Sequence, residues 1–148
     1  MEQDILQLDN QLCFRLYSIS RKMTKAYEPL LEKYHLTYPQ YVTMLVVFEH
    51  EKIDFKELAD RVNLKTATMT PIVQKLEQIG YVRREKNPED NRKVFVTLTD
   101  EGKSLNTRIT DVPIELAQRL QLTVDKYATL VDELDELDAL LNNVLQQP

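Results

Sequence analysis

One thiol and one run of basic side chains are the groups in this chain whose types suit specific chemistry. Cys13 is the only cysteine in the 148 residues, within the stretch QLCFRLYSISRKM (11–23). As a thiolate such a residue can attack a peroxide, although a lone free cysteine often acts only as a small buried hydrophobe. One cysteine excludes an intrachain disulfide, and with only two histidines it argues against a zinc site. We therefore expect neither a metal nor a cofactor.

The basic run lies between residues 83 and 93. Five positive and three negative side chains give this segment a net charge of +2 (5 − 3), in a chain whose net charge is −5. An acidic chain does not coat nucleic acid indiscriminately, so binding to DNA would require such a local patch. A charge run can also be an ordinary solvated hairpin. The basic side chains are Arg83, Arg84, Lys86, Arg92 and Lys93.

A set of polar side chains precedes this run. Hydroxyl, amide and ammonium groups of this kind can donate hydrogen bonds to phosphates and to base edges. An apolar set at helical spacing, beginning at Met69 and ending at Ile79, lies among them, so the polar groups should share the outer face of one helix. The polar set is Lys65, Thr66, Thr68, Thr70, Gln74 and Lys75.

The elements that position these residues follow from periodicity. Residues 54–80 contain two short helical patterns separated by a brief turn, and the second stops at Gly80. Alternation in 81–86 and 92–98, on either side of the turn sequence NPED, predicts a β-hairpin. A helix-turn-helix followed directly by a hairpin is the order of a winged helix, in which the second helix enters the major groove of DNA.

Helices are expected on both sides of this unit, because apolar residues recur there at three- and four-residue steps. The helix after Thr99 should bend near Pro113, since proline has no N–H to donate. The fold class is therefore mainly α with a small β-hairpin wing. The expected helices run over residues 4–27, from a cap at Thr37 to about His50, over 100–120, and from a cap at Thr123 onward.

The wing carries a motif that identifies a family. Asp90-Asn91-Arg92, followed by Leu98-Thr99 and Gly102, resembles the wing signature of MarR-type transcription regulators, and the likeness covers nearly the whole chain. It implies that Arg92 enters the minor groove and that Asp90 holds the wing in shape. It also implies a homodimer on a pseudo-palindromic operator. The implied organisation is one MarR-type domain over 1–148, with a winged helix-turn-helix lobe at 36–99 and dimerisation helices at 1–35 and 100–148.

The stretches QLCFRLY, MTKAYEPLL and LTYPQY resemble a narrower branch, the one-cysteine organic-hydroperoxide-sensing repressors of the MarR family. In that branch the sensing cysteine, here Cys13, is hydrogen-bonded to two tyrosines that correspond to Tyr27 and Tyr38. Fourteen residues separate Cys13 from Tyr27, or about 21 Å along a helix at roughly 1.5 Å per residue. Their contact must therefore cross a dimer. Tyr17 lies one turn after the cysteine, close enough to be a third hydrogen-bond partner, from the same subunit.

The resulting hypothesis is a cytoplasmic, non-enzymatic DNA-binding repressor that loses operator affinity when peroxide oxidises Cys13. Without a second cysteine, the oxidised sulfur can become a mixed disulfide with a low-molecular-weight thiol, a backbone sulfenamide or a higher oxide, and the mixed disulfide is the product we expect. Three alternatives stay open: a MarR-type regulator that responds to a small aromatic ligand with Cys13 inert, a one-cysteine thiol peroxidase, and a protein-interaction adaptor. No stretch is apolar enough to predict a membrane span.

Overall fold

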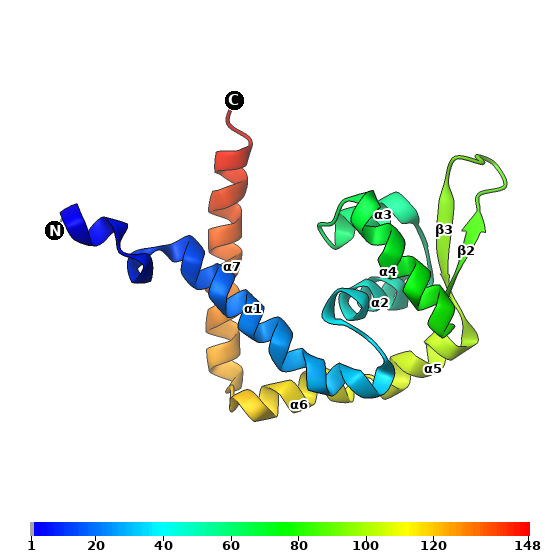
Figure 1. The fold of residues 1–148 in the computed structure, drawn as a ribbon, viewed down its shortest axis with the longest axis horizontal. Coiled ribbons are helices and arrows are strands. Elements are labelled where there is room, and N and C mark those ends of the chain that lie inside the picture. Colours follow the sequence, from blue (N-terminus) through cyan, green and yellow to red (C-terminus); the bar gives the residue numbers. More distant parts are fainter. Residues whose placement is uncertain (1) are drawn as a thin grey trace. The chain divides into compact units, whose positions relative to one another are not determined.

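The computed structural model describes residues 2–148, which form helices and one small sheet (Figure 1). It confirms the mainly α fold with a β-hairpin wing. The chain divides into two compact units, one ending at Val112 and one beginning at Pro113. In chain order, with η for a 3-10 helix, the elements are η1 (Glu2–Leu6), η2 (Leu8–Asn10), α1 (Leu12–Leu31), η3 (Glu32–Tyr34), α2 (Tyr38–His50), β1 (Lys52–Asp54), α3 (Phe55–Arg61), α4 (Thr66–Ile79), β2 (Val82–Lys86), β3 (Val94–Leu98), α5 (Asp100–Arg108), α6 (Asp111–Leu120) and α7 (Val124–Leu145).

The helix-turn-helix is formed by α3 and α4, as the sequence predicts. The Asp54 carboxylate caps α3 by accepting the backbone N–H groups of Lys56 and Glu57 at 2.9 and 3.2 Å. Gly80 ends α4 with a φ of 101°, a conformation that glycine adopts without steric cost. The apolar side chains that join α2, α3 and α4 are fully buried, and they include Met44, Val47, Leu58, Met69, Val73 and Leu76.

The predicted hairpin is also confirmed, with β2 and β3 antiparallel and Arg84 opposite Val96. A third strand, β1, pairs with the other edge of β3 and gives the sheet the order β1-β3-β2. Sequence periodicity missed β1 because three residues are too few to display an alternation. Its central residue, Ile53, is buried opposite Val96.

Two predicted helices are wrong in their limits. The first begins at Leu12 rather than at residue 4, because two 3-10 segments precede it, and it continues through Pro29 to Leu31. The helix expected over 100–120 is divided in two, and the break lies at residues 109–110, near Pro113 as expected. The ring of a proline clashes with the carbonyl four residues earlier, here that of Ile109, so the chain leaves the helix there.

The Leu98-Thr99…Gly102 motif has a packing role at the junction of the wing and α5. The Thr99 hydroxyl accepts the N–H of Gly102 at 3.1 Å and donates to the carbonyl of Gly80. A Cβ on Gly102 would lie 2.3 Å from the carbonyl oxygen of Tyr81 and 2.6 Å from a methyl group of Leu98. Only glycine therefore lets α5 start this close to the base of the hairpin.

Candidate nucleic-acid interface and thiol site

The outer face of α4 carries the polar set expected from the sequence. Met69, Val73 and Leu76 point into the core, which leaves the opposite side of the helix to solvent. The Thr70 hydroxyl donates to the carbonyl of Thr66 at 3.0 Å and keeps its lone pairs free to accept. The exposed polar residues are Lys65, immediately before α4, and Thr66, Thr68, Thr70, Gln74 and Lys75.

The tip of the wing is shaped by Asp90. Its carboxylate accepts the backbone N–H of Arg92 at 3.0 Å and the Nε of the same residue at 3.3 Å. The side chain of Arg92 is nevertheless 92% exposed. Two contacts to one carboxylate fix the turn while the rest of the guanidinium extends outward, beside the exposed Lys93.

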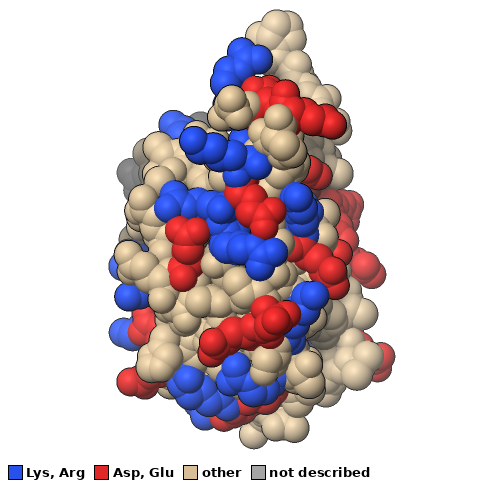
Figure 2. All heavy atoms as spheres, turned by 90° about the vertical axis from the view of Figure 1, so that its right-hand side faces the viewer, with Lys and Arg blue, Asp and Glu red and all other residues tan. Residues whose placement is uncertain are grey.

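The remaining basic residues of the wing differ in whether they form ion pairs. Arg83 pairs with Glu85 at 2.6 Å on the same strand, and Arg84 pairs with Glu77 of α4 at 3.0 Å. These hydrogen bonds hold the pKa of both carboxyls below the usual value. Lys86 is exposed at the end of β2. Figure 2 shows the resulting surface, on which basic and acidic side chains alternate.

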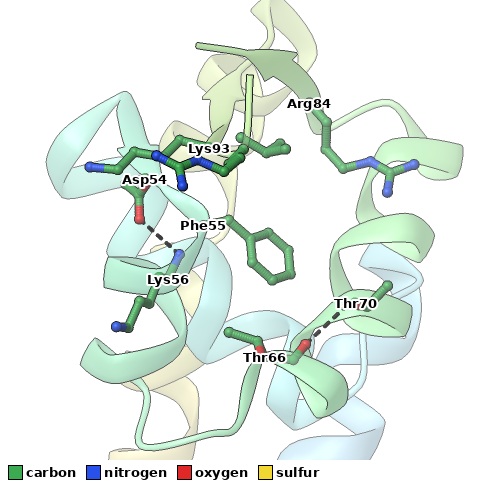
Figure 3. A pocket seen from close by; sticks show the side chains of 9 residues that line it. Asp54, Phe55, Lys56, Thr66, Thr70, Arg84 and Lys93 are labelled. Carbon is green, nitrogen blue, oxygen red and sulfur yellow. Dashed lines mark hydrogen bonds between the residues drawn. The ribbon is translucent and has the colours of Figure 1, made fainter. Parts of the chain in front are cut away.

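A pocket of about 540 Å³ opens between the start of α3, the start of α4 and the wing (Figure 3). The Phe55 ring points toward its centre, with Thr66 and Thr70 on one side. Four of its lining residues are basic and one is acidic. Arg84 is paired with Glu77, but the other three basic residues still outnumber the one carboxylate, so the pocket favours an anionic group such as a phosphate. Lys56 is a basic residue that the sequence reasoning missed, because it lies outside both patterned segments. The charged residues are Lys56, Arg84, Arg92, Lys93 and Asp54.

Cys13 is exposed and is the second residue of α1. The sequence predicted a helix that begins at residue 4, but α1 begins at Leu12, so Cys13 lies in its first turn. The N-cap residue Gln11 makes no side-chain cap to the first N–H groups of α1. Those groups lack partners within the helix and form its electropositive end. Arg15 lies close by, where its Nε donates to the carbonyl of Asp9 at 2.8 Å.

Tyr27 and Tyr38, two of the three predicted hydrogen-bond partners of the cysteine, lie together in one subunit. Their ring centroids are 5.0 Å apart, and the Tyr41 ring lies 5.6 Å from that of Tyr27. Burial raises the pKa of Tyr41 to about 12, with a smaller contribution from the other two phenols. Sequence reasoning did not identify Tyr41 as a member of this tyrosine cluster, because the spacing of a buried aromatic carries no sign of its neighbours.

Tyr17 has a different environment from the tyrosine cluster. It is exposed on α1, one turn after Cys13, and the Arg21 guanidinium lies 5.6 Å from the centre of its ring. An Arg21 nitrogen is 3.4 Å from the Tyr17 hydroxyl, which it can use as an acceptor. Within the part of the chain that the structure describes, no group of side chains is suited to hold a metal ion, and no helix is long and apolar enough to cross a membrane.

The fold and the basic wing define the class of a winged-helix regulator, and comparison with known proteins places the chain within it. The family model for the SarA/Rot transcriptional regulators matches residues 25–109. The organic hydroperoxide resistance transcriptional regulator of Bacillus subtilis is 43% identical over 110 residues, which are 74% of this chain and 75% of that one. The chain therefore belongs to the MarR-type family of transcriptional regulators, in its one-cysteine, organic-hydroperoxide branch.

Solved structures agree over the full length of the chain. Reduced AbfR bound to DNA superposes with a TM-score of 0.86 at 29% identity, covering 99% of this chain and 100% of that one. Disulfide-formed AbfR superposes with a TM-score of 0.66 at 29% identity, covering 99% and 98%. Because the relatives are transcriptional regulators, the family is not one of enzymes, which argues against the thiol peroxidase alternative.

Proposed function

We propose that two copies of this chain bind a pseudo-palindromic operator and release it when Cys13 is oxidised. For DNA binding, the outer face of α4 supplies hydroxyl, amide and ammonium donors, and the pocket beside it suits a backbone phosphate. Binding of DNA by the related AbfR supports the same use of this surface. In this proposal α4 enters the major groove and Arg92 enters the adjacent minor groove.

The two-fold arrangement is supported by apolar side chains that have no cover in one subunit. On α1, Leu12, Ile19 and Met23 are exposed, and α7 exposes a longer series of leucines. A second copy that covers these faces accounts for them, since single chains rarely leave such large apolar areas in water. The dimer would present two copies of α4 about 34 Å apart, one turn of DNA.

The position of the tyrosine cluster is the observation that carries the sensing half of the proposal. Cys13 and Tyr27 both lie on α1, roughly 21 Å apart along its axis, so the cluster can contact a sensing cysteine only if that cysteine comes from the other subunit. A thiol at such a junction can report its oxidation to both DNA-binding lobes at once. A bulky adduct would separate the phenols from the sulfur and change the spacing of the two α4 helices.

The chemistry needs one hydroperoxide and one small thiol per subunit. The Cys13 thiolate attacks the O–O bond, which gives the sulfenic acid and an alkoxide that leaves as the alcohol after protonation. A thiol then attacks the sulfenic sulfur, forms the mixed disulfide and releases water. A second thiol restores Cys13 by exchange. The existence of a disulfide form of AbfR supports disulfide formation as the switching event in this branch.

The test is operator binding by wild type and Cys13→Ser, with and without cumene hydroperoxide plus a small thiol, with intact-mass spectrometry on the same samples. We expect the two proteins, when reduced, to bind the operator equally tightly. Only wild type should gain the mass of one thiol adduct per subunit and lose affinity, by at least about tenfold, or 1.4 kcal/mol. If Cys13→Ser releases DNA as wild type does, thiol sensing is wrong.

A second candidate rests on a hollow of about 930 Å³ beside Tyr38, between the end of α1 and the start of α2. Its lining includes Pro29, Leu36 and Pro39, and a small aromatic molecule would fit such a surface. A regulator of this kind would respond to the ligand with Cys13 inert. The Cys13→Ser experiment separates the two candidates, because ligand-induced release does not require the thiol.

A further inference from the structure

Glu77 joins the last turn of α4 to the middle of β2. Its Oε2 accepts the backbone N–H of Arg84 at 2.9 Å. Its Oε1 accepts Nε and Nη2 of the same residue at 3.1 and 3.0 Å. Both carboxylate oxygens are thus committed to one residue, through its main chain and through its side chain. A link of this kind fixes the path of the strand as well as the rotamer of the arginine.

No other ion pair found among residues 4–148 joins the hairpin to α4. Arg83 and Glu85 lie on one strand, Lys52 and Glu85 on two strands of the sheet, and Asp90 and Arg92 in the turn. Because Arg84 pairs with Val96 of β3, holding Arg84 holds both strands of the hairpin at their midpoint. The contact therefore sets how the whole wing lies against α4.

We propose that Glu77 is a positioning residue that sets the distance between the DNA-reading face of α4 and Arg92 at the wing tip. The proposal rests on the DNA-binding function proposed above. Arg84 extends along α4 at the edge of the pocket (Figure 3), and its charge is largely compensated by Glu77. Arg84 thus acts on DNA through the position of the wing, which differs from the direct contact expected from the sequence.

The physical advantage lies in preorganisation. The face of α4 and the wing contact the duplex as two linked sites, and a rigid link lets the second contact form without a further loss of conformational freedom. When the link is loosened, the wing must be ordered on the DNA. Arg92 then contributes less to affinity, although its own side chain is unchanged.

The experiment compares Glu77→Gln with Glu85→Gln. Each variant removes one negative charge from an arginine-paired carboxylate near or on the wing, but only the first breaks the link to α4. Binding is measured at fixed salt to a duplex selected by wild type from a randomised library, with Arg92→Ala made in each background. We expect Arg92→Ala to weaken binding roughly tenfold in wild type and in Glu85→Gln, and roughly two- to threefold in Glu77→Gln.

An equal cost of Arg92→Ala in all three backgrounds would overturn the inference, since a residue that merely stabilises the fold would leave this coupling unchanged. A second readout needs no DNA: backbone amide order parameters at residues 89–93 should fall in Glu77→Gln and stay at the wild-type value in Glu85→Gln. Unchanged order in both also overturns the inference. If wild type selects no duplex, the proposed function fails, while the order parameters still decide the role of Glu77.

Discussion

Asp111 is a single residue that ties three parts of the first unit together. One carboxylate oxygen accepts the hydroxyl of Tyr34 at 2.8 Å, and the other pairs with Lys33. The Tyr34 hydroxyl also contacts the carbonyl of Arg108, and the Tyr34 carbonyl accepts the hydroxyl of Tyr81 at 3.0 Å. The segment η3 and the break between α5 and α6 therefore meet at this carboxylate, and Tyr34 extends the connection to Tyr81 at the base of the wing.

Asp111→Asn should destabilise the protein in a pH-dependent way. The hydrogen bond from Lys33, assisted by that from Tyr34, lowers the pKa of Asp111 below its usual value. A lowered pKa contributes stability above the unfolded-state pKa of about 3.9, and this is lost as pH falls through the folded-state value. We expect the variant to lose about 1 kcal/mol at pH 7, a modest value because the side chain is 40% exposed.

Urea unfolding of both proteins from pH 7 down to the acid limit of the folded state provides the measurement. The two unfolding free energies should converge only as pH falls below about 4, toward the lowered folded-state pKa of Asp111. Asp132→Asn, on the exposed face of α7, serves as the control and should have little effect at any pH. A difference between wild type and Asp111→Asn that stays constant with pH would show that charge is not the source.

Among the elements, those with a capping residue at one end were predictable from the sequence. Thr37 and Gln40 form the capping box that begins α2, Thr99 and Thr123 cap α5 and α7, and Gly80 ends α4. Their side chains or backbone freedom act on residues within a few positions, so the signal and the structure lie together in the chain. The helix ends that carry these signals therefore followed directly from the pattern.

Elements that depend on distant partners were missed or misplaced. The strand β1 exists because it pairs with β3, more than forty residues later, and the first turn of α1 has no side-chain cap to mark it. The residues of the candidate site fall into the same two groups, those with a local signal and those that depend on distant partners. Cys13 and the wing were found from residue type and local motif, whereas Tyr41, Lys56 and the engagement of Arg84 by Glu77 depend on tertiary neighbours.

The cap of α2 bears on the thiol site because α2 begins with Tyr38. The Thr37 hydroxyl accepts the N–H of Gln40 at 3.4 Å, and the Gln40 side chain accepts the N–H of Thr37 at 3.0 Å. Thr37→Ala should reduce the free energy of unfolding by about 1 kcal/mol and loosen the first turn. Thr37→Ser keeps the hydroxyl and should restore most of the loss in the same denaturation measurement; equal losses would exclude capping as the cause.

For the whole molecule, the exposed apolar side chains of α7 decide how many copies assemble. Leucines and other large apolar residues recur along one side of this 22-residue helix, and none of them is buried within one subunit. A helix with such a stripe buries it against another element when it is stable in water. The exposed ones are Val124, Tyr127, Leu130, Leu134, Leu140, Leu141, Val144 and Leu145.

Leu134→Lys should therefore convert the proposed dimer to monomer. Leu134 is 51% exposed in one subunit, near the middle of the stripe, and an ammonium group there would lose its hydration if a second copy covered it. Sedimentation equilibrium at micromolar concentration measures the change in mass. Glu136→Gln is the control, because it also raises the net charge of the chain by one. Residue 136 lies about 200° around the helix from Leu134, at roughly 100° per residue, so this variant should stay dimeric.

Operator affinity should follow the state of assembly. A monomer contacts one half-site and loses the linked second contact, so Leu134→Lys should bind the full operator at least about a hundredfold more weakly than wild type. Glu136→Gln should bind as tightly as wild type or slightly more tightly, because it reduces the negative charge of the chain. A Leu134→Lys protein that remains dimeric would show that α7 does not form the interface, and the contact between the subunits would then have to be sought on α1.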